Sequence, residues 1–561
     1  MDDLNKITYF AETDSRHEHK KFGIKAGDRS KHVYVIGKSG MGKSTLLENM
    51  AIQDIQGGNG IVFIDPHGGT AEKLLEYVPE ERVKDVLYFA PFDMEHPIAF
   101  NIMEDVGAEK RHLVVNGLMS VFEKIWEDAW SARMAYILQN TLLALLEYPG
   151  ATLLAVNRMY TDKEFRTKVV ANVTDVSVKS FWVDEYAKYT DKYVSEATPA
   201  IQNKIGQFAG NPLIRNIIGQ PKSSFDLRKV MDEKKIMIVN LSKGRVGEGN
   251  ARLLGSMLIT KIYLAAMSRA DESATTMAKL PPLYLFVDEF QSFADKSFAD
   301  ILSEARKYKL CLTMAHQYIE QMEEEVRDAV FGNVGSMIAF RVGAYDADVL
   351  EKEFAPVFVA EDLVNLGLRQ IYLKLMIDSV TSQPFSATTM APIPQQPIPH
   401  VQEVIASSRT AYSKTRAEVE KAIVDWHGEG KLMPAAPRPA TAYQAPQFSG
   451  PKPLDTRSFA PKPVPPPVPK PIAPKLLKKE PPKISLEELK KKNDNQRKPD
   501  EKNVSALRDV IKSMVKEEKP RTNDQRPTIP ATPTTPKATQ AEIAPKTGPN
   551  PEELKKLLGV E

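Results

Sequence analysis

One short stretch, VYVIGKSGMGKSTLLENMA from Val33 to Ala51, constrains the fold more than any other part of this 561-residue chain. An apolar run is followed by a loop with the spacing Gly-x-x-x-x-Gly-Lys-Ser and then by apolar residues at helical intervals. Glycines let backbone N–H groups wrap a phosphate, and the next helix presents the positive end of its dipole to the same anion. The stretch therefore predicts a strand, a phosphate-binding loop and a helix.

The loop also predicts roles for single residues. Lys43 is expected to reach the β- and γ-phosphates of ATP, and the Ser44 hydroxyl to ligate Mg²⁺. ATP and Mg²⁺ are therefore the cofactors that the sequence predicts. The residues expected to line the nucleotide are Gly37, Lys38, Ser39, Gly40, Met41, Gly42, Lys43, Ser44 and Thr45.

Short apolar runs recur from the loop to about residue 376, without polar alternation. Such runs are typical of strands buried on both faces of a parallel sheet that helices cover. They are VYVIG, IVFIDP, VLYFAP, IMIVNLS, LYLFVDE, CLTMAHQ, SMIAFRV and IYLKLM. The front of the chain is therefore expected to be an α/β domain with a mostly parallel sheet.

Between the third and fourth of these runs, helix-period segments such as RHLVVNGLMSVFEKIWEDAW replace the strand pattern. This change predicts an all-helical domain, residues 105–221, inserted into a nucleotide-binding domain made of residues 33–104 and 222–390. Residues 1–32 are treated as a lead segment, and residues 391–433 as a linker with a charged helix.

The rest of the chain, residues 434–561, has a different composition. Of the 41 prolines, 29 follow residue 390, and PKPVPPPVPKPIAPK is typical of an extended polyproline spacer. We predict a disordered tail rich in proline and lysine. Two amphipathic pieces, NVSALRDVIKSMVKEE and NPEELKKLLGVE, are either helices that dock on a protein partner or solvated tail, and both interpretations stay open.

Composition restricts the remaining functions. The net charge is +2, so a nucleic-acid site must be local. The single cysteine, Cys311, is expected to be a small buried hydrophobe. The chain has neither a signal core nor a run of about 18 apolar residues, which predicts a cytoplasmic protein.

Hydrolysis requires carboxylates, and LYLFVDEFQSF places two at the end of an apolar strand. Asp288 is expected to support Mg²⁺, and Glu289 to orient and polarise the attacking water. The alternative is an acidic strand end that faces solvent. A complete phosphate loop in the same chain favours the catalytic interpretation.

Two further residues have two open interpretations each. Gln317 ends the run CLTMAHQ, where it either senses the γ-phosphate or simply closes a strand. Arg306 in LSEARKYK is either an exposed helix arginine or a finger that reaches a neighbouring subunit's phosphates. Spacing alone favours the exposed arginine.

The order of motifs resembles that of the FtsK–HerA superfamily of ring-forming ATPases, and most of all the conjugative DNA-transfer coupling proteins of type IV secretion. The resemblance spans residues 30–380 and rests on GKSGMGKST, VFIDPHGG, YFAPFDMEHPIAFN, NLSKGRVGEGN, FVDEFQSF, RKYKLCLTMAHQ and GNVGSMIAFRVGAYDA. It implies a RecA-like motor domain, a hexameric ring with ATP between subunits, and DNA in the central channel.

The resemblance also bears on single residues. Arg306 holds the place, before Gln317, of an arginine that acts on the neighbouring subunit's nucleotide, which raises the finger interpretation. Asp65 and His67 match a family motif without a defined chemical step, and a turn-stabilising role is equally open. Lys243 and Arg245 in NLSKGRVGEGN either contact DNA phosphates or belong to a solvated loop.

The sequence departs from the family in its attachments. Membrane-bound coupling proteins carry N-terminal transmembrane helices, whereas about thirty residues precede this loop, and no C-terminal winged helix is recognisable. A role at the inner membrane is therefore expected to need a separate partner, docked on the tail. We expect an ATP-driven DNA translocase. The alternatives are a secretion or pilus-assembly ATPase that acts on protein, or a nucleotide-controlled interaction hub.

Overall fold

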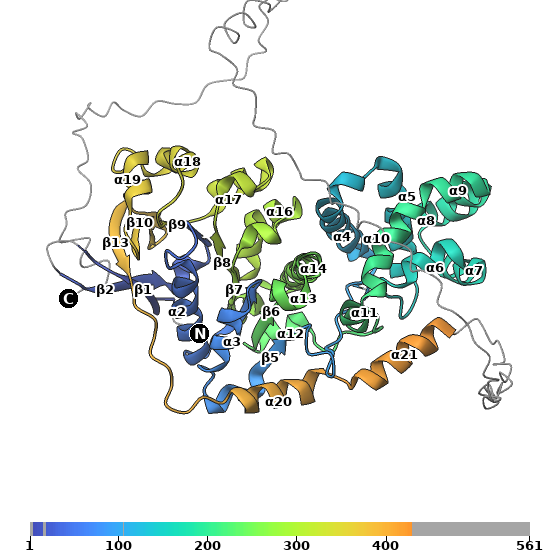
Figure 1. The fold of residues 1–561 in the computed structure, drawn as a ribbon, viewed down its shortest axis with the longest axis horizontal. Helices are drawn as coiled ribbons and strands as arrows, with labels where there is room; N and C mark the ends of the chain where they lie inside the picture. The colour runs from blue at the N-terminus through green and yellow to red at the C-terminus, as the bar shows by residue number, and fades with distance from the viewer. Residues whose placement is uncertain (1–3, 15–17, 105, 429–561) are drawn as a thin grey trace, which may run out of the picture. The chain divides into compact units, whose positions relative to one another are not determined.

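A central sheet organises the computed structural model, which describes residues 4–14, 18–104 and 106–428 (Figure 1). The eleven strands lie in the order β2-β1-β13-β10-β9-β3-β8-β7-β4-β6-β5. From β9 to β5 all neighbours are parallel, and from β2 to β9 all are antiparallel. The strands are β1 (Ile7–Glu12), β2 (Lys21–Lys25), β3 (Val33–Ile36), β4 (Gly60–Asp65), β5 (Val86–Phe89), β6 (Ile236–Asn240), β7 (Leu283–Val287), β8 (Leu310–His316), β9 (Ser336–Ala339), β10 (Gln370–Lys374) and β13 (Phe385–Thr389), with β11 (Met376–Ile377) and β12 (Val380–Thr381) as a separate pair.

The predicted α/β class is confirmed, and each of the eight apolar runs forms a strand. Alternate residues of these strands enter two different cores. On β3, Tyr34 and Ile36 belong to one core, whereas Val33 and Val35 belong to the other. Because both faces are covered, the runs lack polar alternation.

Helices cover the two faces of the sheet (Figure 1). Apolar residues of α2 and α3 pack into the core that contains Val33, and those of α14, α16, α17 and α18 into the core that contains Tyr34. These helices are α2 (Lys43–Gln56), α3 (Gly69–Leu75), α14 (Glu248–Met267), α16 (Ser297–Glu304), α17 (Glu324–Asn333) and α18 (Ala344–Phe354). Shorter helices are α1 (Ala26–Arg29), α12 (Leu227–Asp232), α13 (Lys243–Val246), α15 (Ala274–Lys279) and α19 (Ala360–Asn365).

Between β5 and β6 the chain is helical. A Cβ on Gly117 would lie 2.4 Å from Cγ2 of Thr260, so the absence of a side chain lets α4 pack closely on α14. Within this region Trp126 stacks on Phe122, with 4.4 Å between ring centroids. The helices are α4 (Arg111–Ile125), α5 (Ala132–Leu146), α6 (Ala155–Thr161), α7 (Lys163–Asn172), α8 (Val176–Ser180), α9 (Asp191–Ala197), α10 (Pro199–Gly210) and α11 (Pro212–Ile218).

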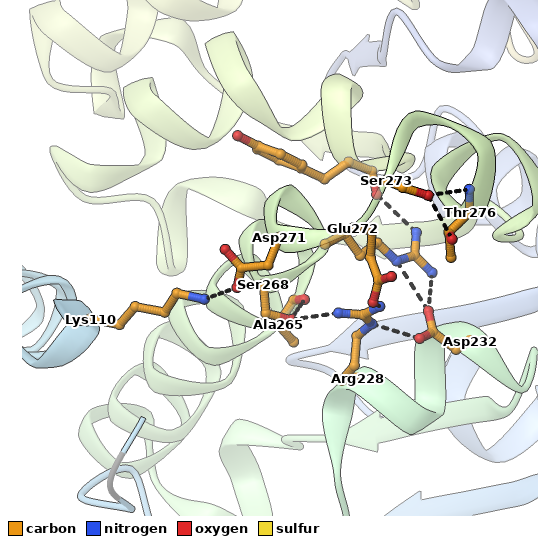
Figure 2. A network of polar contacts seen from close by, with 11 residues as sticks. Lys110, Arg228, Asp232, Ala265, Ser268, Asp271, Glu272, Ser273 and Thr276 are labelled. Carbon is orange, nitrogen blue, oxygen red and sulfur yellow. Dashed lines mark hydrogen bonds and ion pairs between the residues drawn. The ribbon is translucent and has the colours of Figure 1, made fainter. Parts of the chain in front are cut away.

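Polar contacts tie the start of this helical region to the end of α14 (Figure 2). Lys110 Nζ pairs with Asp271 Oδ2 at 2.5 Å. Nearby, Arg228 of α12 donates to Asp232 at 2.6 Å and to Glu272 at 2.9 Å. The 3-10 turn after α14 (Ser268–Asp271) is therefore held from two sides.

Two features differ from the expected organisation. Residues 7–14 and 18–25, which sequence analysis treats as part of a lead segment, contain β1 and β2 of the same sheet as the phosphate loop, with β2 at the edge and β1 between β2 and β13. After the last strand, α20 (Val401–Tyr412) and α21 (Arg416–Gly428) run along the outside, and Ser408 Oγ accepts a hydrogen bond from the backbone N–H of Tyr88 on β5. The predicted proline-rich tail and its two docking helices lie outside the described residues. Every helix in the described ranges is too short or too polar to cross a bilayer.

Candidate nucleotide site

The phosphate loop joins the end of β3 to the start of α2, and its glycines are required by geometry. Gly40 and Gly42 have φ angles of 77° and 118°, in the region that side chains disfavour. A Cβ on Gly37 would lie 2.5 Å from the Cβ of Phe340 on the neighbouring strand segment. The glycines therefore let the chain turn tightly from β3 into the N-terminus of α2, the geometry that anion binding requires.

Lys43 lies across the loop at the first position of α2. Its Nζ donates to the carbonyl oxygens of Gly37 at 2.6 Å and of Lys38 at 3.3 Å. Burial lowers the pKa of Lys43, and the carboxylates of Glu289 and Asp288 oppose that change. The ammonium group is thus held next to the place where the loop would bind phosphates.

Asp288 directly follows β7 and is 2% exposed. Its Oδ2 accepts a hydrogen bond of 2.9 Å from Ser44 Oγ. Burial raises the pKa of the Asp288 carboxyl, and the nearby Asp65 and Glu289 add to this effect. A hydroxyl beside a buried carboxylate fits the oxygen ligands that Mg²⁺ prefers, so Ser44 and Asp288 would hold that ion.

Glu289 has an unusual backbone conformation, with φ 47° and ψ 48°. Its Oε2 accepts a hydrogen bond of 2.5 Å from Gln291 Nε2, and its Oε1 lies 3.9 Å from His67 Nε2. Burial works to raise the pKa of Glu289, but His67, Gln291 and Lys43 outweigh it and keep the pKa below its ordinary value. Glu289 is therefore charged at neutral pH and engaged by its neighbours.

Asp65 and His67 have different surroundings at the end of β4. The Asp65 carboxylate is fully buried and accepts hydrogen bonds from the backbone N–H groups of His67 at 2.7 Å and Ala71 at 2.9 Å. It thereby shapes the turn into α3. The His67 side chain is exposed and faces Glu289, whose carboxylate is the chief cause of the raised pKa of His67.

Gln317 lies directly after β8, beside the phosphate loop. Its Nε2 donates to Ser39 Oγ at 2.5 Å and to Tyr318 Oη at 3.2 Å. The strand next to it is β3, because β8 and β3 pair in parallel with His316 opposite Ile36. The fold thus brings Gln317 to the loop, as proximity to a γ-phosphate would require.

Arg306 lies at the other end of β8. It belongs to a 3-10 turn (Ala305–Tyr308) and is exposed. The buried Arg269 steadies this turn by donating to the Tyr308 carbonyl oxygen at 2.8 Å. A strand of seven residues spans on the order of 20 Å, so Arg306 cannot reach the phosphates of its own subunit.

Lys243 and Arg245 belong to α13, just after β6. Lys243 Nζ donates to Ser292 Oγ at 3.1 Å. Arg245 pairs with Glu72 at 2.9 Å, and its guanidinium lies 3.5 Å above the ring of Phe92. Both cations therefore contact neighbouring elements of the same edge.

Sequence analysis did not identify two polar residues of this site, Gln291 and Ser292. Both follow Glu289 within the run DEFQS, and their polarity directly after a buried strand is the signal that was present. Their contacts depend on the order of the strands, and here β4 lies beside β7 and β6 lies beside β4, although the chain separates these strands widely. Spacing alone does not encode that order.

A covered sheet with a phosphate loop after one strand and Asp288–Glu289 after another defines a RecA-like P-loop NTPase. A family model described as "Type IV secretory system Conjugative DNA transfer" matches residues 7–343. The chain belongs to this family of conjugative coupling proteins.

Solved structures with a similar fold include the bacterial conjugative coupling protein TrwBdeltaN70 in complex with sulphate, with a TM-score of 0.50 and 15% identity over 71% of this chain and 98% of that one. TrwB in complex with a non-hydrolysable ATP analogue has a TM-score of 0.49 and 14% identity over 70% and 96%. VirB4 of Thermoanaerobacter pseudethanolicus has a TM-score of 0.48 and 14% identity over 69% and 98%. At this identity the likeness concerns the fold. Comparison with curated protein sequences gives no match.

Proposed function

We propose that this chain is an ATP-hydrolysing ring motor that moves DNA, or a protein–DNA complex, in conjugative transfer. The observation that carries the proposal is the division of the catalytic groups along β8. Gln317 joins the phosphate loop at one end, and Arg306 is presented at the other end, out of reach of the same site. In a family of conjugative coupling proteins, such a division favours a site completed by a second subunit.

In the proposed reaction the subunit that binds ATP supplies most of the chemistry. Lys43 would leave the loop carbonyls and neutralise charge on the β- and γ-phosphates. Ser44 and Asp288 would hold Mg²⁺, which neutralises phosphate charge when bound. Glu289 would accept a hydrogen bond from the attacking water and polarise it, and Gln317 would contact the γ-phosphate.

The neighbouring subunit would supply Arg306. An arginine from a neighbour stabilises the charge of the transition state and makes hydrolysis depend on assembly. We propose a hexameric ring, as the resemblance to ring-forming ATPases implies, with one nucleotide at each interface. Turnover would then be negligible in monomers and would rise with protein concentration.

The cargo is proposed from the family and from one segment. Residues 242–250, which comprise α13 and the first turn of α14, contain three glycines and the cations Lys243 and Arg245, and most of this segment is exposed. Cations on such a segment suit the phosphates of a DNA backbone in a central channel. We place the motor in the cytoplasm, at the inner membrane only through a secretion-complex partner that docks on residues 434–561.

Steady-state ATPase assays with and without single- and double-stranded DNA test this proposal. We expect DNA to stimulate turnover of the assembled protein, and DNA affinity to fall steeply with salt because phosphate contacts release counterions. Lys43→Ala should lose nucleotide turnover altogether. Assembled rings that hydrolyse ATP without any response to either DNA would contradict DNA as the cargo and favour a protein substrate.

A further inference from the structure

The carboxylate of Glu289 is occupied by its own neighbours. Gln291 Nε2 donates to Oε2, and His67 Nε2 faces Oε1. A group that is to polarise water needs a free acceptor oxygen aimed at that water. Gln291 therefore fixes the orientation of the Glu289 carboxylate, and aiming a carboxylate oxygen at the water beside a bound nucleotide would require this contact to change.

The segment that carries Gln291 is itself braced from outside. It is a 3-10 turn (Phe290–Ser292), closed by the Ser292 N–H, which donates to the Glu289 carbonyl oxygen at 2.8 Å. Ser292 is 8% exposed, and Lys243 Nζ donates to its hydroxyl at 3.1 Å. The Lys243 ammonium, which comes from the connection after β6, thus holds the turn directly after Glu289.

The same loop also contacts the element that carries His67. The Lys243 backbone N–H donates to the Pro66 carbonyl oxygen at 2.9 Å, next to His67. Arg245 pairs with Glu72 of α3, the helix that starts after the His67 turn. Both segments that hold the Glu289 carboxylate therefore lie against residues 242–250.

We propose that Lys243 is a positioning residue that restrains Glu289 through Ser292, and that a DNA phosphate competes for the Lys243 ammonium and releases the restraint. The inference rests on the proposed function. It makes Lys243 the link between DNA contact and hydrolysis, since one ammonium group serves both.

Residues 242–250 have the properties that an exchange of Lys243 between Ser292 and a DNA phosphate needs. A Cβ at Gly244 or Gly249 would meet no atom within 4 Å, so the backbone there has open space around it. Gly247 has φ 86°, a conformation that glycine adopts at little cost. A phosphate oxygen is a charged acceptor, which binds an ammonium group more strongly than the neutral hydroxyl of Ser292 does.

Two substitutions at Ser292 test the brace without changing any charge. Ser292→Ala removes the acceptor, and we expect DNA-free kcat to rise on the order of fivefold, the effect of losing one modest hydrogen bond, with KM for ATP unchanged. Ser292→Thr retains the acceptor hydroxyl and should keep the restraint, so its DNA-free kcat should stay below that of Ser292→Ala. Because a DNA phosphate competes with Ser292 for the Lys243 ammonium, Ser292→Ala should also tighten DNA binding by up to about the same factor, measured with a fluorescent oligodeoxythymidine.

Lys243→Met should raise DNA-free kcat as Ser292→Ala does and should also lose stimulation by DNA. Lys168→Met, on α7 with only the exposed Glu164 as its ion-pair partner, is the matched loss of one charge and should change neither quantity. Thermal unfolding of each variant reports folding separately.

The results separate this inference from the proposed function. A Ser292→Ala protein with the DNA-free kcat of wild type would overturn the restraint, whatever DNA does. A second outcome is a wild type that hydrolyses ATP without any response to DNA while Ser292→Ala is still faster. The proposal of DNA as cargo then fails, and the release of Lys243 by DNA is overturned with it. The restraint that Lys243 places on Glu289 through Ser292 would still hold. Lys243→Met with full DNA stimulation would overturn the exchange.

Discussion

The parallel strands of the central sheet begin at one side, the amino edge, and end at the other, the carboxyl edge. The polar side chains at these two edges have different partners. At the carboxyl edge, where β3, β7 and β8 end, Ser44, Asp288, Glu289 and Gln317 contact one another or the phosphate loop. At the amino edge Arg306 is exposed and lines a cavity of about 900 Å³ whose cations are Lys6, Lys25, Lys234, Lys279, Arg306 and Lys309. The carboxyl edge gathers the groups proposed to bind the nucleotide, whereas the amino edge presents Arg306, with Lys25 of the same cavity paired to Asp378 at 2.6 Å. The contrast suits a motor whose subunits meet edge to edge.

Beneath the exposed cations, the amino edge contains a buried ion pair. Arg29 donates to both carboxylate oxygens of Asp54, at 2.9 Å and 2.8 Å, and both side chains are 1% exposed. The guanidinium also lies 3.6 Å above the ring of Tyr284. These charges have no solvent access and serve structure, so substitutions at the two edges should fail in different ways.

The largest effect is expected at Arg306. Arg306→Ala should reduce kcat of assembled rings about 10³–10⁵-fold, the range for an arginine finger, and leave nucleotide affinity of the isolated chain unchanged. Lys307→Ala, which removes the neighbouring exposed cation that pairs with Glu304, is the control.

Mixing two inactive variants tests the role of Arg306 more directly. Arg306→Ala and Lys43→Ala subunits are each inactive alone, but a mixed ring has interfaces that combine an intact loop with an intact Arg306. ATPase activity should therefore return on mixing. Near-normal turnover of Arg306→Ala by itself would show that the two edges do not share one site.

Next in size is the loss of the catalytic carboxylate. Glu289→Gln should reduce kcat about 10²–10⁴-fold, because the amide polarises water poorly, while a fluorescent ATP analogue still binds. Asp288→Asn should instead weaken Mg²⁺-dependent binding. Normal turnover in Glu289→Gln would assign the water to another group.

At the amino edge the expected loss is in stability. Asp54→Asn leaves the Arg29 guanidinium buried beside a neutral group, which should cost about 3–5 kcal/mol in the free energy of unfolding measured in urea. Glu304→Gln breaks the exposed pair with Lys307 on the same edge and should cost about 0–1 kcal/mol. Equal losses of stability in Asp54→Asn and Glu304→Gln would contradict burial as the cause of the difference.

The last contrast is a pH dependence, with one buried histidine at each edge. Burial lowers the pKa of His32, before β3, from 6.5 to about 4, and that of His316, at the end of β8, from 6.5 to about 3. The unfolded chain binds these protons first, so stability should fall as pH drops below about 6.5, by about 1.4 kcal/mol per pH unit and histidine.

Single substitutions separate the two histidines. His32→Asn should flatten the loss of stability between pH 6.5 and about 4, and His316→Asn should flatten it down to about 3, as measured by urea midpoints. A wild-type midpoint that stays constant from pH 7 to 5 would contradict neutral buried histidines at either edge.

The parallel strands were predictable from sequence because each is buried on both faces, and the same burial explains Cys311, whose thiol pKa is raised to about 12 by loss of solvent. The strands β1, β2 and β13 were missed. They are short antiparallel strands with exposed positions, so their residues show no continuous apolar run. Such strands depend on pairing partners that a local pattern does not specify.

The candidate site likewise contains residues that the local sequence predicts and contacts that it does not. The glycines of the phosphate loop and the pair Asp288 and Glu289 follow from local chemistry, because each lies within a few residues of its strand. The contacts of Glu289 with His67, and of Lys243 with Ser292, arise because β7, β4 and β6 lie in that order in the sheet. Their partners could not be read from spacing, and their roles stay predictions.

The strand β1 can pair with β13 only late in the synthesis of the chain. Ala11 lies opposite Thr389, about 380 positions later in the chain. At about 5–20 residues per second, a ribosome needs on the order of 20–75 s to make that distance. During this time the first hairpin emerges without its neighbour, and its free strand edge is open to other chains. Chains still being synthesised are therefore expected to expose this strand edge until their own last strand arrives.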